Sequence, residues 1–169
     1  MIAVDTNLLV YAHRAEVPFH EAARRCIASL AESRLPWAIP WPCVHEFCSV
    51  VTNPRVYKTP TPIAGATMQV DIWLESPSIV LLNETAAHWG TFRSLIAMAG
   101  VRGGMVHDAR IAAICLDNGV RELWSADRDF NRFPSQQPRQ GFCLPIALAG
   151  TAMNGLMPAE RLSPGSASN

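Results

Sequence analysis

The segment from Val106 to Phe133 constrains the fold of this chain more than any other part of the sequence. It begins with a predicted helix over Asp108–Leu116 that is apolar on almost every face, and such a helix has to be buried. Asn118-Gly119 ends this helix, because glycine readily adopts the left-handed conformation that closes a helix. A short strand over Glu122–Ser125 follows and runs into a polar turn, Ala-Asp-Arg-Asp-Phe. The segment therefore predicts a buried helix followed by a strand.

Acidic residues stand at the ends of these two elements. Asp108 lies in the first turn of the buried helix, where its neighbours at i+3 and i+4 are Ile111 and Ala112. Asp127 follows the strand, at the carboxyl end where open α/β sheets bind their ligands. A charge against apolar surroundings is unfavourable unless something compensates it. The remaining sequence should therefore supply a compensating group.

Strands and helices alternate along the rest of the chain. The predicted strands are short apolar runs, whereas the predicted helices repeat their apolar residues at helical spacing. We expect strands at Ile2–Val4, Trp37–Ile39, Ser78–Leu82 and Phe142–Leu144, and helices at Asp5–Tyr11, His20–Ser33, Cys43–Val51, Ile63–Glu75 and Thr85–Ala99. This alternation predicts an α/β fold in which a parallel sheet carries helices on both faces.

The composition excludes several classes of protein. The chain has 169 residues, 49% of them hydrophobic, which predicts a single globular domain. Its formal net charge of zero provides no general attraction to nucleic acid. The 5 cysteines show no Cys-x-x-Cys spacing, so we expect reduced thiols rather than disulfides or a zinc site. With no signal peptide and no apolar run of membrane-spanning length, the sequence predicts a cytoplasmic protein without a membrane partner.

The predicted parallel sheet would bring four acids to one edge. Asp5 and Asp127 leave the carboxyl ends of strands, and Asp108 and Glu46 sit early in helices that start from the same edge. Gathered carboxylates raise one another's pKa and call for a cation, and oxygen ligands select Mg²⁺ or Mn²⁺ over zinc. Such an ion suits phosphodiester hydrolysis. Taken singly, Asp5 or Thr6 could be a helix N-cap, and Glu46 a solvated side chain.

Four motifs of this sequence resemble those of the PIN-domain ribonucleases, most closely the VapC toxins of bacterial toxin–antitoxin pairs. They are MIAVDTN at the N-terminus, Val-His-Glu-Phe, Val-His-Asp-Ala-Arg-Ile-Ala-Ala and Trp-Ser-Ala-Asp-Arg-Asp-Phe. The resemblance covers roughly residues 1–148, so we expect a PIN domain there and a partly flexible C-terminal tail over 149–169. It implies a PIN-like three-layer fold, with a central, mostly parallel sheet flanked by helices.

The resemblance also implies an activity and a set of site residues. It implies an Mg²⁺- or Mn²⁺-dependent endoribonuclease whose metal-binding quartet is Asp5, Glu46, Asp108 and Asp127. The residues that match auxiliary positions are Asn7 and Ser125, as polar helpers, and Asp129, as an extra acid that could instead cap its turn. The resemblance further implies a homodimer, inhibition by a small VapB-type antitoxin, and DNA binding only through the antitoxin complex.

As a hypothesis, the three aspartates of the quartet hold one or two metal ions, and Glu46 orients or deprotonates the attacking water. Glu46 could instead only support the metal ligands. Arg102 and Arg128 are candidate contacts to RNA phosphates, although either could be an ordinary solvated arginine. The sequence does not specify which RNA is cut; Trp41, Trp89 and Tyr57 could stack on bases, but we expect each to belong to the core.

Other functions remain to be weighed against this one. A PIN module could bind an antitoxin or RNA without cutting it, and a housekeeping RNA-processing nuclease would carry the same acids. A response-regulator phospho-acceptor would need a paired acidic cluster near the N-terminus and a helper lysine, and a dehydrogenase would need a glycine-rich turn after the first strand. The sequence has neither pattern.

Overall fold

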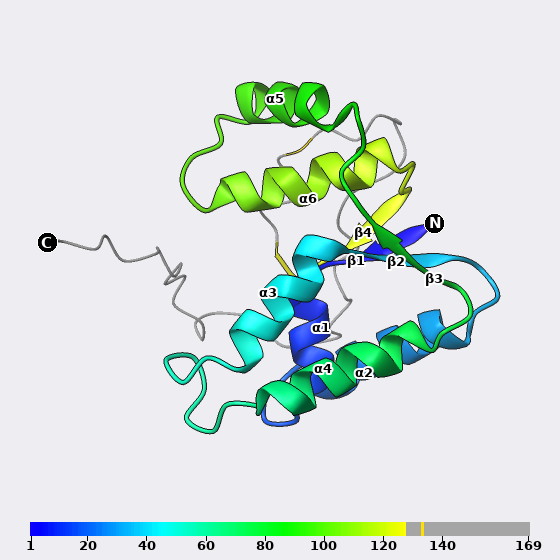
Figure 1. Cartoon of the computed structure of the whole chain (residues 1–169), viewed down its shortest axis with the longest axis vertical. Coiled ribbons are helices and arrows are strands. Elements are labelled where there is room, and N and C mark those ends of the chain that lie inside the picture. The colour runs from blue at the N-terminus through cyan, green and yellow to red at the C-terminus, as the bar shows by residue number, and fades with distance from the viewer. Residues whose placement is uncertain (128–132, 134–169) are drawn as a thin grey trace, which may run out of the picture.

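The structure is a computed structural model that describes residues 1–127 and residue 133. At its centre is a parallel sheet of four strands in the order β3-β2-β1-β4 (Figure 1). In this sheet β1 (Ile2–Val4) lies between β2 (Trp37–Pro40) and β4 (Glu122–Trp124), and β2 also pairs with β3 (Ile79–Leu82). The parallel sheet predicted from the sequence is therefore confirmed, and β1, β2 and β4 all end at one edge.

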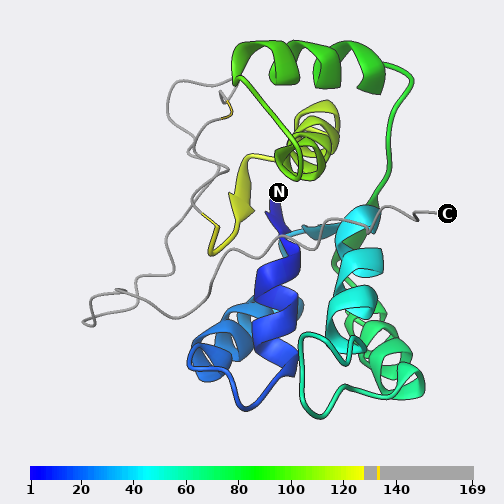
Figure 2. The same cartoon turned by 90° about the vertical axis from the view of Figure 1, so that its left-hand side faces the viewer.

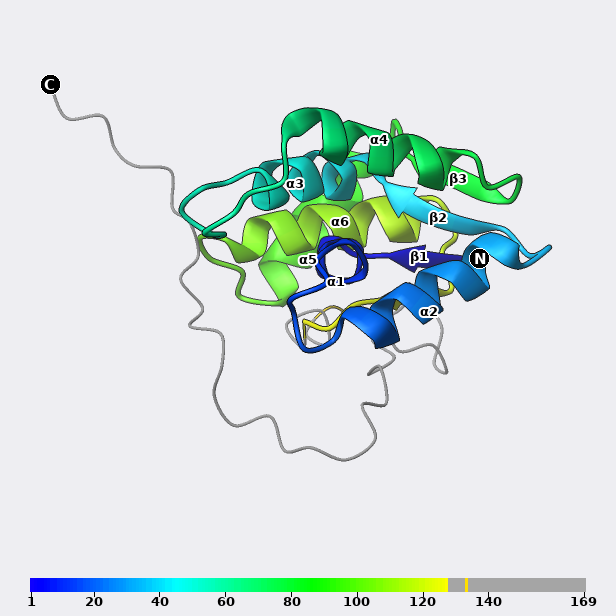
Figure 3. The same ribbon diagram turned by 90° about the horizontal axis from the view of Figure 1, so that it is seen from below.

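Helices cover both faces of this sheet. Their bounds are α1 Thr6–His13, α2 His20–Glu32, α3 Trp41–Val51, α4 Ile63–Leu74, α5 His88–Met98 and α6 Met105–Asp117. Figures 1 and 2 place α5 and α6 on one side of the sheet and α1 to α4 on the other. Figure 3 shows α1 between α2 and α3, and α1 contacts both of these helices. The chain therefore forms the three layers that the PIN resemblance implies.

The core lies where the central strands meet α1, α3 and α6. Every residue of β2 is buried, because this strand is covered on both faces. Most of α6 is buried as well, including Ala109 and the run Ile111–Cys115, which confirms that this helix is apolar because it is enclosed. Gly119 has φ of 67°, the left-handed conformation expected of the glycine that ends α6.

Several element boundaries differ from the sequence prediction. Helix α3 begins at Trp41 rather than Cys43, because Pro42 fits the first turn of a helix, where its missing N–H is not needed. Helix α6 begins at Met105, so Asp108 is its fourth residue rather than its first. Helix α5 begins at His88 instead of Thr85, whose hydroxyl accepts a hydrogen bond from the Ala87 N–H at 3.2 Å in the turn before it.

Trp89 is not a core residue, and the prediction that it would be was wrong: it is 65% exposed. The centroid of its ring lies 6.0 Å from that of the Phe92 ring. Trp41 and Tyr57 are partly buried against the core, as expected. The predicted strand over Phe142–Leu144 and the tail over 149–169 lie outside the described residues.

The cysteines of the described residues are free thiols, namely Cys26, Cys43, Cys48 and Cys115, whereas Cys143 lies beyond them. Among the helices described, none combines the length and the apolar character that crossing a membrane requires.

Candidate active site

Asp5 lies at the junction of β1 and α1 and is buried, with 5% of its surface exposed. It occupies the N-cap position of α1, but its side chain makes no capping hydrogen bond, so the capping role does not account for it. Instead its Oδ2 accepts a hydrogen bond from the Ser125 hydroxyl at 2.8 Å, and its Oδ1 accepts a longer one from the Cys43 thiol at 3.8 Å. The carboxylate is therefore oriented by groups that follow β4 and β2.

The pKa of Asp5 is shifted in part by the other acids around it. This pKa is raised from 3.8 to about 7, chiefly by burial and in addition by the negative charges of Glu46 and Asp108. Hydrogen bonds from Ser125 and from the Thr6 backbone N–H act in the opposite direction. Glu46 and Asp108 thus both lie within electrostatic reach of Asp5, in an arrangement whose charged form is unfavourable without a cation.

Glu46 is joined to the start of α1 by a residue that the sequence suggested only as a helix cap. The hydroxyl of buried Thr6 donates a hydrogen bond to Glu46 Oε2 at 2.7 Å, across 40 residues of sequence. Because β1 and β2 are neighbours in the sheet, α1 and α3 leave the same edge and pack side by side. Glu46 is exposed, but it is held in place, so it is not merely a solvated side chain at the edge of α3.

Asn7 and Ser125 fix the turn that carries Asp127. The Asn7 amide donates to Ser125 Oγ at 2.9 Å, and its Oδ1 accepts from the Ala126 N–H at 3.0 Å. Ser125 Oγ also accepts from the Asp127 N–H at 2.9 Å. The same serine hydroxyl thus links Asp127 to Asp5. Ser125 itself is completely buried, whereas the Asp127 side chain is exposed.

Tyr11 shows that Asp127 and Asp5 face a common region. Burial raises the pKa of the Tyr11 phenol, and the charges of Asp127 and Asp5 raise it further. Asp108 lies half-buried in the first turn of α6, on the same side as Asp5. The four acids are therefore gathered around the carboxyl edge of β1, where the parallel topology predicts them.

The remaining predicted residues are placed differently. Arg102 is exposed in the loop between α5 and α6. Arg128 and Asp129 lie outside the described residues. Thr6, Cys43 and Tyr11 contribute to the site although the sequence predicted no role in it for them. The only signal for Thr6 was its position beside Asp5; its contact with Glu46 is tertiary.

The donor set fits a hard divalent cation. It consists of carboxylate groups, of which Asp5 is buried beside the negative charges of Glu46 and Asp108. Mg²⁺ and Mn²⁺ prefer such oxygen ligands, and their positive charge would balance the acids. In the part of the chain that the structure describes, no group of at least 3 His, Cys, Asp or Glu side chains is close enough to hold a metal ion by itself. Magnesium keeps several waters and needs only one or two direct carboxylates, so this spacing is compatible with it.

The comparisons with known proteins place this arrangement in a family. The family model of the PIN domain matches residues 2–135. Ribonuclease VapC43 of Mycobacterium tuberculosis is 39% identical over 133 residues, which are 79% of this chain and 90% of that protein. This chain belongs to the VapC ribonucleases of the PIN-domain family. The resemblance inferred from the four sequence motifs is therefore confirmed.

Further relatives of this VapC-family chain agree with that assignment. Ribonuclease VapC31 of Mycobacterium tuberculosis is 31% identical over 135 residues, covering 80% of this chain and 94% of its own. Among solved structures, VapC20 of Mycobacterium tuberculosis, described as a Sarcin-Ricin loop cleaving toxin, superimposes with a TM-score of 0.58 at 18% identity and covers 76% of this chain and 92% of its own. VapBC2 from Rickettsia felis, bound to a DNA fragment from its promoter, has a TM-score of 0.58 at 20% identity, with coverages of 79% and 94%. These two structures support the fold.

Proposed function

We propose that this VapC-family chain is a metal-dependent endoribonuclease that cleaves RNA phosphodiester bonds as the toxin of a VapBC-type toxin–antitoxin pair. The observation that carries the proposal is the buried Asp5 carboxylate beside Glu46 and Asp108, in a chain 39% identical to a VapC ribonuclease. A buried acid among other acids is costly to keep charged in a protein that binds no cation.

The three aspartates are the proposed metal ligands. Asp5, Asp108 and Asp127 would hold Mg²⁺ or Mn²⁺, directly or through the waters that the ion keeps, and the bound ion would polarise the phosphate and lower the pKa of a water molecule. Ser125 keeps the Asp5 carboxylate in one orientation through its 2.8 Å hydrogen bond and fixes the backbone of Asp127 at 2.9 Å. Asn7 holds Ser125 in turn, so these polar helpers limit how far the two aspartates can move apart.

Glu46 is the proposed base. It is exposed to solvent, and the Thr6 hydroxyl occupies its Oε2, which leaves Oε1 to accept a proton from the attacking water. Arg102 and Arg128 are the proposed contacts to RNA phosphates, and Asp129 is the proposed auxiliary acid. The whole site would then be built on the PIN domain, which we take to span residues 1–148, followed by the tail over 149–169.

The proposed partners follow from the family. A VapB-type antitoxin would inhibit this chain, and DNA would be bound only through the antitoxin complex. The Rickettsia felis structure, described as VapBC2 bound to a DNA fragment from its promoter, supports a complex that binds DNA. We further propose a homodimer that acts in the cytoplasm, where its RNA substrate is. A short overlapping upstream gene would favour this toxin role over housekeeping RNA processing.

Incubation of the purified protein with total bacterial RNA tests the activity. We expect cleavage in Mn²⁺ or Mg²⁺ and none in EDTA. Asp108→Asn should lower the rate by at least about 100-fold, as expected when one group that stabilises transition-state charge is removed. Asp71→Asn, the same change at an exposed position of α4, is the matched control and should leave the rate unchanged.

Sequencing the 5′ ends of the fragments would identify the cleaved site. Cleavage by Asp108→Asn at the wild-type rate would contradict the metal role. RNA that is bound but not cleaved in the presence of either metal would instead identify a non-catalytic PIN module.

A further inference from the structure

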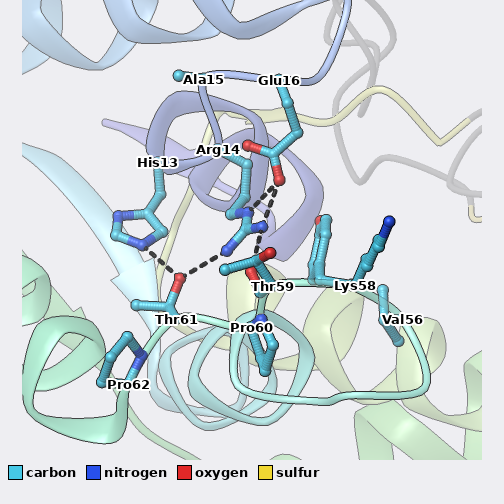
Figure 4. A pocket seen from close by; sticks show the side chains of 11 residues that line it. His13, Arg14, Ala15, Glu16, Val56, Lys58, Thr59, Pro60, Thr61 and Pro62 are labelled. Atoms are coloured by element: carbon cyan, nitrogen blue, oxygen red, sulfur yellow. Dashed lines mark hydrogen bonds and ion pairs between the residues drawn. The ribbon is translucent and has the colours of Figure 1, made fainter.

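A second group of charged and polar side chains lies at the far end of α1. Here the end of α1 and the loop of residues 52–62 between α3 and α4 enclose a pocket of about 720 Å³ (Figure 4). Its lining includes the side chains of Arg14, Glu16, Tyr57, Lys58 and Thr61. The volume is in the range of pockets that bind small organic ligands.

The Arg14 guanidinium is fixed in this pocket by the protein itself. Arg14 is only 9% exposed, and its Nη1 donates to Thr61 Oγ1 at 2.8 Å. Its Nη2 donates to the Thr59 carbonyl oxygen at 2.8 Å, and the guanidinium lies 4.0 Å above the centre of the Tyr57 ring. These contacts come from the 52–62 loop, so the plane of the guanidinium is set before any ligand binds.

The remaining edge of the guanidinium is occupied by an exposed carboxylate. Glu16 Oε1 accepts hydrogen bonds from Arg14 Nε and Nη2, the first at 2.8 Å, while the Glu16 side chain is 55% exposed. Phosphate oxygens can bind this same Nε–Nη2 edge of a guanidinium. A phosphate carries the same sign of charge as this exposed carboxylate, so it can replace Glu16 without leaving the buried guanidinium unpaired.

Lys58 places a second positive charge at the same pocket. Its side chain is exposed and projects from the 52–62 loop, and no hydrogen bond holds it within the described part of the chain. With Glu16 displaced, Arg14 and Lys58 would present two positive charges to a ligand. The pocket then suits an oxyanion that has a larger group attached, as in a nucleic-acid backbone.

The pocket and the acidic centre are linked along α1. This helix has 8 residues and is therefore about 12 Å long, a distance that a few nucleotides can span. Tyr11 lies between the two sites. Burial, and to a smaller extent the charges of Asp127 and Asp5, raise the pKa of its phenol. Burial is also the main cause that raises the pKa of Tyr57, and Tyr11 adds a smaller increase. The two sites thus lie at opposite ends of one short helix.

We propose that Arg14 and Lys58 form a seat for a phosphodiester of the substrate RNA, away from the bond that is cut, and that Glu16 occupies this seat until RNA displaces it. The seat rests on the proposed function, because it names how the same substrate is positioned. It adds to the metal centre a contact that depends on backbone charge rather than on base identity.

Binding of fluorescein-labelled single-stranded RNA of randomised sequence tests the seat by anisotropy, in EDTA so that no cleavage occurs. Lys58→Met should weaken binding by about 3- to 10-fold at low salt and reduce the slope of log K against log salt by about 0.7, the value for one lost phosphate contact. Glu16→Gln should tighten binding by about 3-fold, because the competing charge is gone. Arg34→Met removes an exposed charge before β2, at the opposite edge of the sheet, and should change neither quantity.

Equal effects of Lys58→Met and Arg34→Met, or weaker binding by Glu16→Gln with an unchanged melting temperature, would overturn the seat. If Glu16→Gln proves unstable, Lys58→Met carries the test, because its side chain is exposed. Cleavage of total RNA by the same proteins separates the two proposals. If the wild type cleaves RNA while all variants bind RNA equally well, the seat is refuted and the nuclease function stands. If the variants differ in RNA binding as expected but the wild type does not cleave RNA, the seat stands and the nuclease function is refuted.

Discussion

Helix α1 carries a buried ionisable side chain at each end, and the two side chains differ in the charges that surround them. Asp5 at its N-cap is 5% exposed, and Arg14 at its C-cap is 9% exposed. Both signs suit the helix dipole. Arg14 is compensated within the chain by Glu16 and by oxygens of the 52–62 loop, whereas the neighbouring charges that act on Asp5, those of Glu46 and Asp108, are negative.

This difference distinguishes a buried charge that the chain compensates by itself from one that depends on a bound cation. A buried charge with its own partners can be kept for structure, whereas a buried charge among like charges lowers stability until a counter-ion arrives. Removing Arg14 should therefore cost stability, and removing the charge of Asp5 should cost activity. The following predictions test that contrast.

Asp5→Asn should have the largest effect, a loss of RNA cleavage of about 100- to 1000-fold in Mn²⁺. The amide keeps the shape and can still accept a hydrogen bond from Ser125, but it removes the negative charge that a cation needs. Initial rates on total RNA, with Asp71→Asn as the control, measure it. Retention of wild-type cleavage would mean that Asp5, like Arg14, is a structural charge.

Arg14→Met should destabilise the folded protein by about 2 kcal/mol, because it leaves the Thr59 carbonyl and the Thr61 hydroxyl without their charged donor. Urea denaturation measures this loss. Arg24→Met removes the exposed partner of Glu21 on α2 and should have no measurable effect. If the two variants were equally stable, Arg14 would not be the anchor of the 52–62 loop.

Thr6→Val should lower the turnover of RNA by about 10-fold, which corresponds to one lost hydrogen bond to a charged group. The valine keeps the shape of the buried side chain but no longer holds Glu46 Oε2. Thr6→Ser should restore most of the activity, since it restores the hydroxyl. A rate unchanged by Thr6→Val would show that the orientation of Glu46 does not limit catalysis.

Asp5→Asn should also stabilise the metal-free protein, by about 1–2 kcal/mol after allowance for the weaker hydrogen bonds of the amide. The pKa of Asp5 rises from 3.8 to about 7 on folding. Below pH 3.8 the acid is protonated in both states, so burying it costs the wild type no charge; as the pH rises to about 7, the folded wild type loses stability relative to the unfolded state. The advantage of the variant should therefore grow between these values and stay constant above them.

Urea denaturation in EDTA at about pH 5 and about pH 8 measures this gain. Adding Mn²⁺ should reverse the order at the higher pH, because a cation that binds only the folded wild type stabilises it. A wild type that gains no more than the variant from Mn²⁺ would contradict a cation site at Asp5.

Much of the fold follows from patterns that are local in the sequence. The short apolar runs of β1 and β2 and the enclosed helix α6 were predicted, because burial of an element on all sides leaves no polar face in its sequence. The boundaries were harder, as at Pro42, since proline closes a strand and begins a helix equally well. Trp89 was misplaced because hydrophobicity alone does not tell which side of α5 meets α6.

The sequence by itself determined the four acids and the sheet edge that gathers them, because parallel strands all end on one side and the acids directly follow those ends or begin the next helices. Only the tertiary structure decided how the charges are balanced. The bond from Thr6 to Glu46, the serine that joins Asp5 to Asp127, and the loop that encloses Arg14 each connect residues about 40 or more positions apart. Such contacts depend on which surfaces meet after folding, and no local pattern of residues records them.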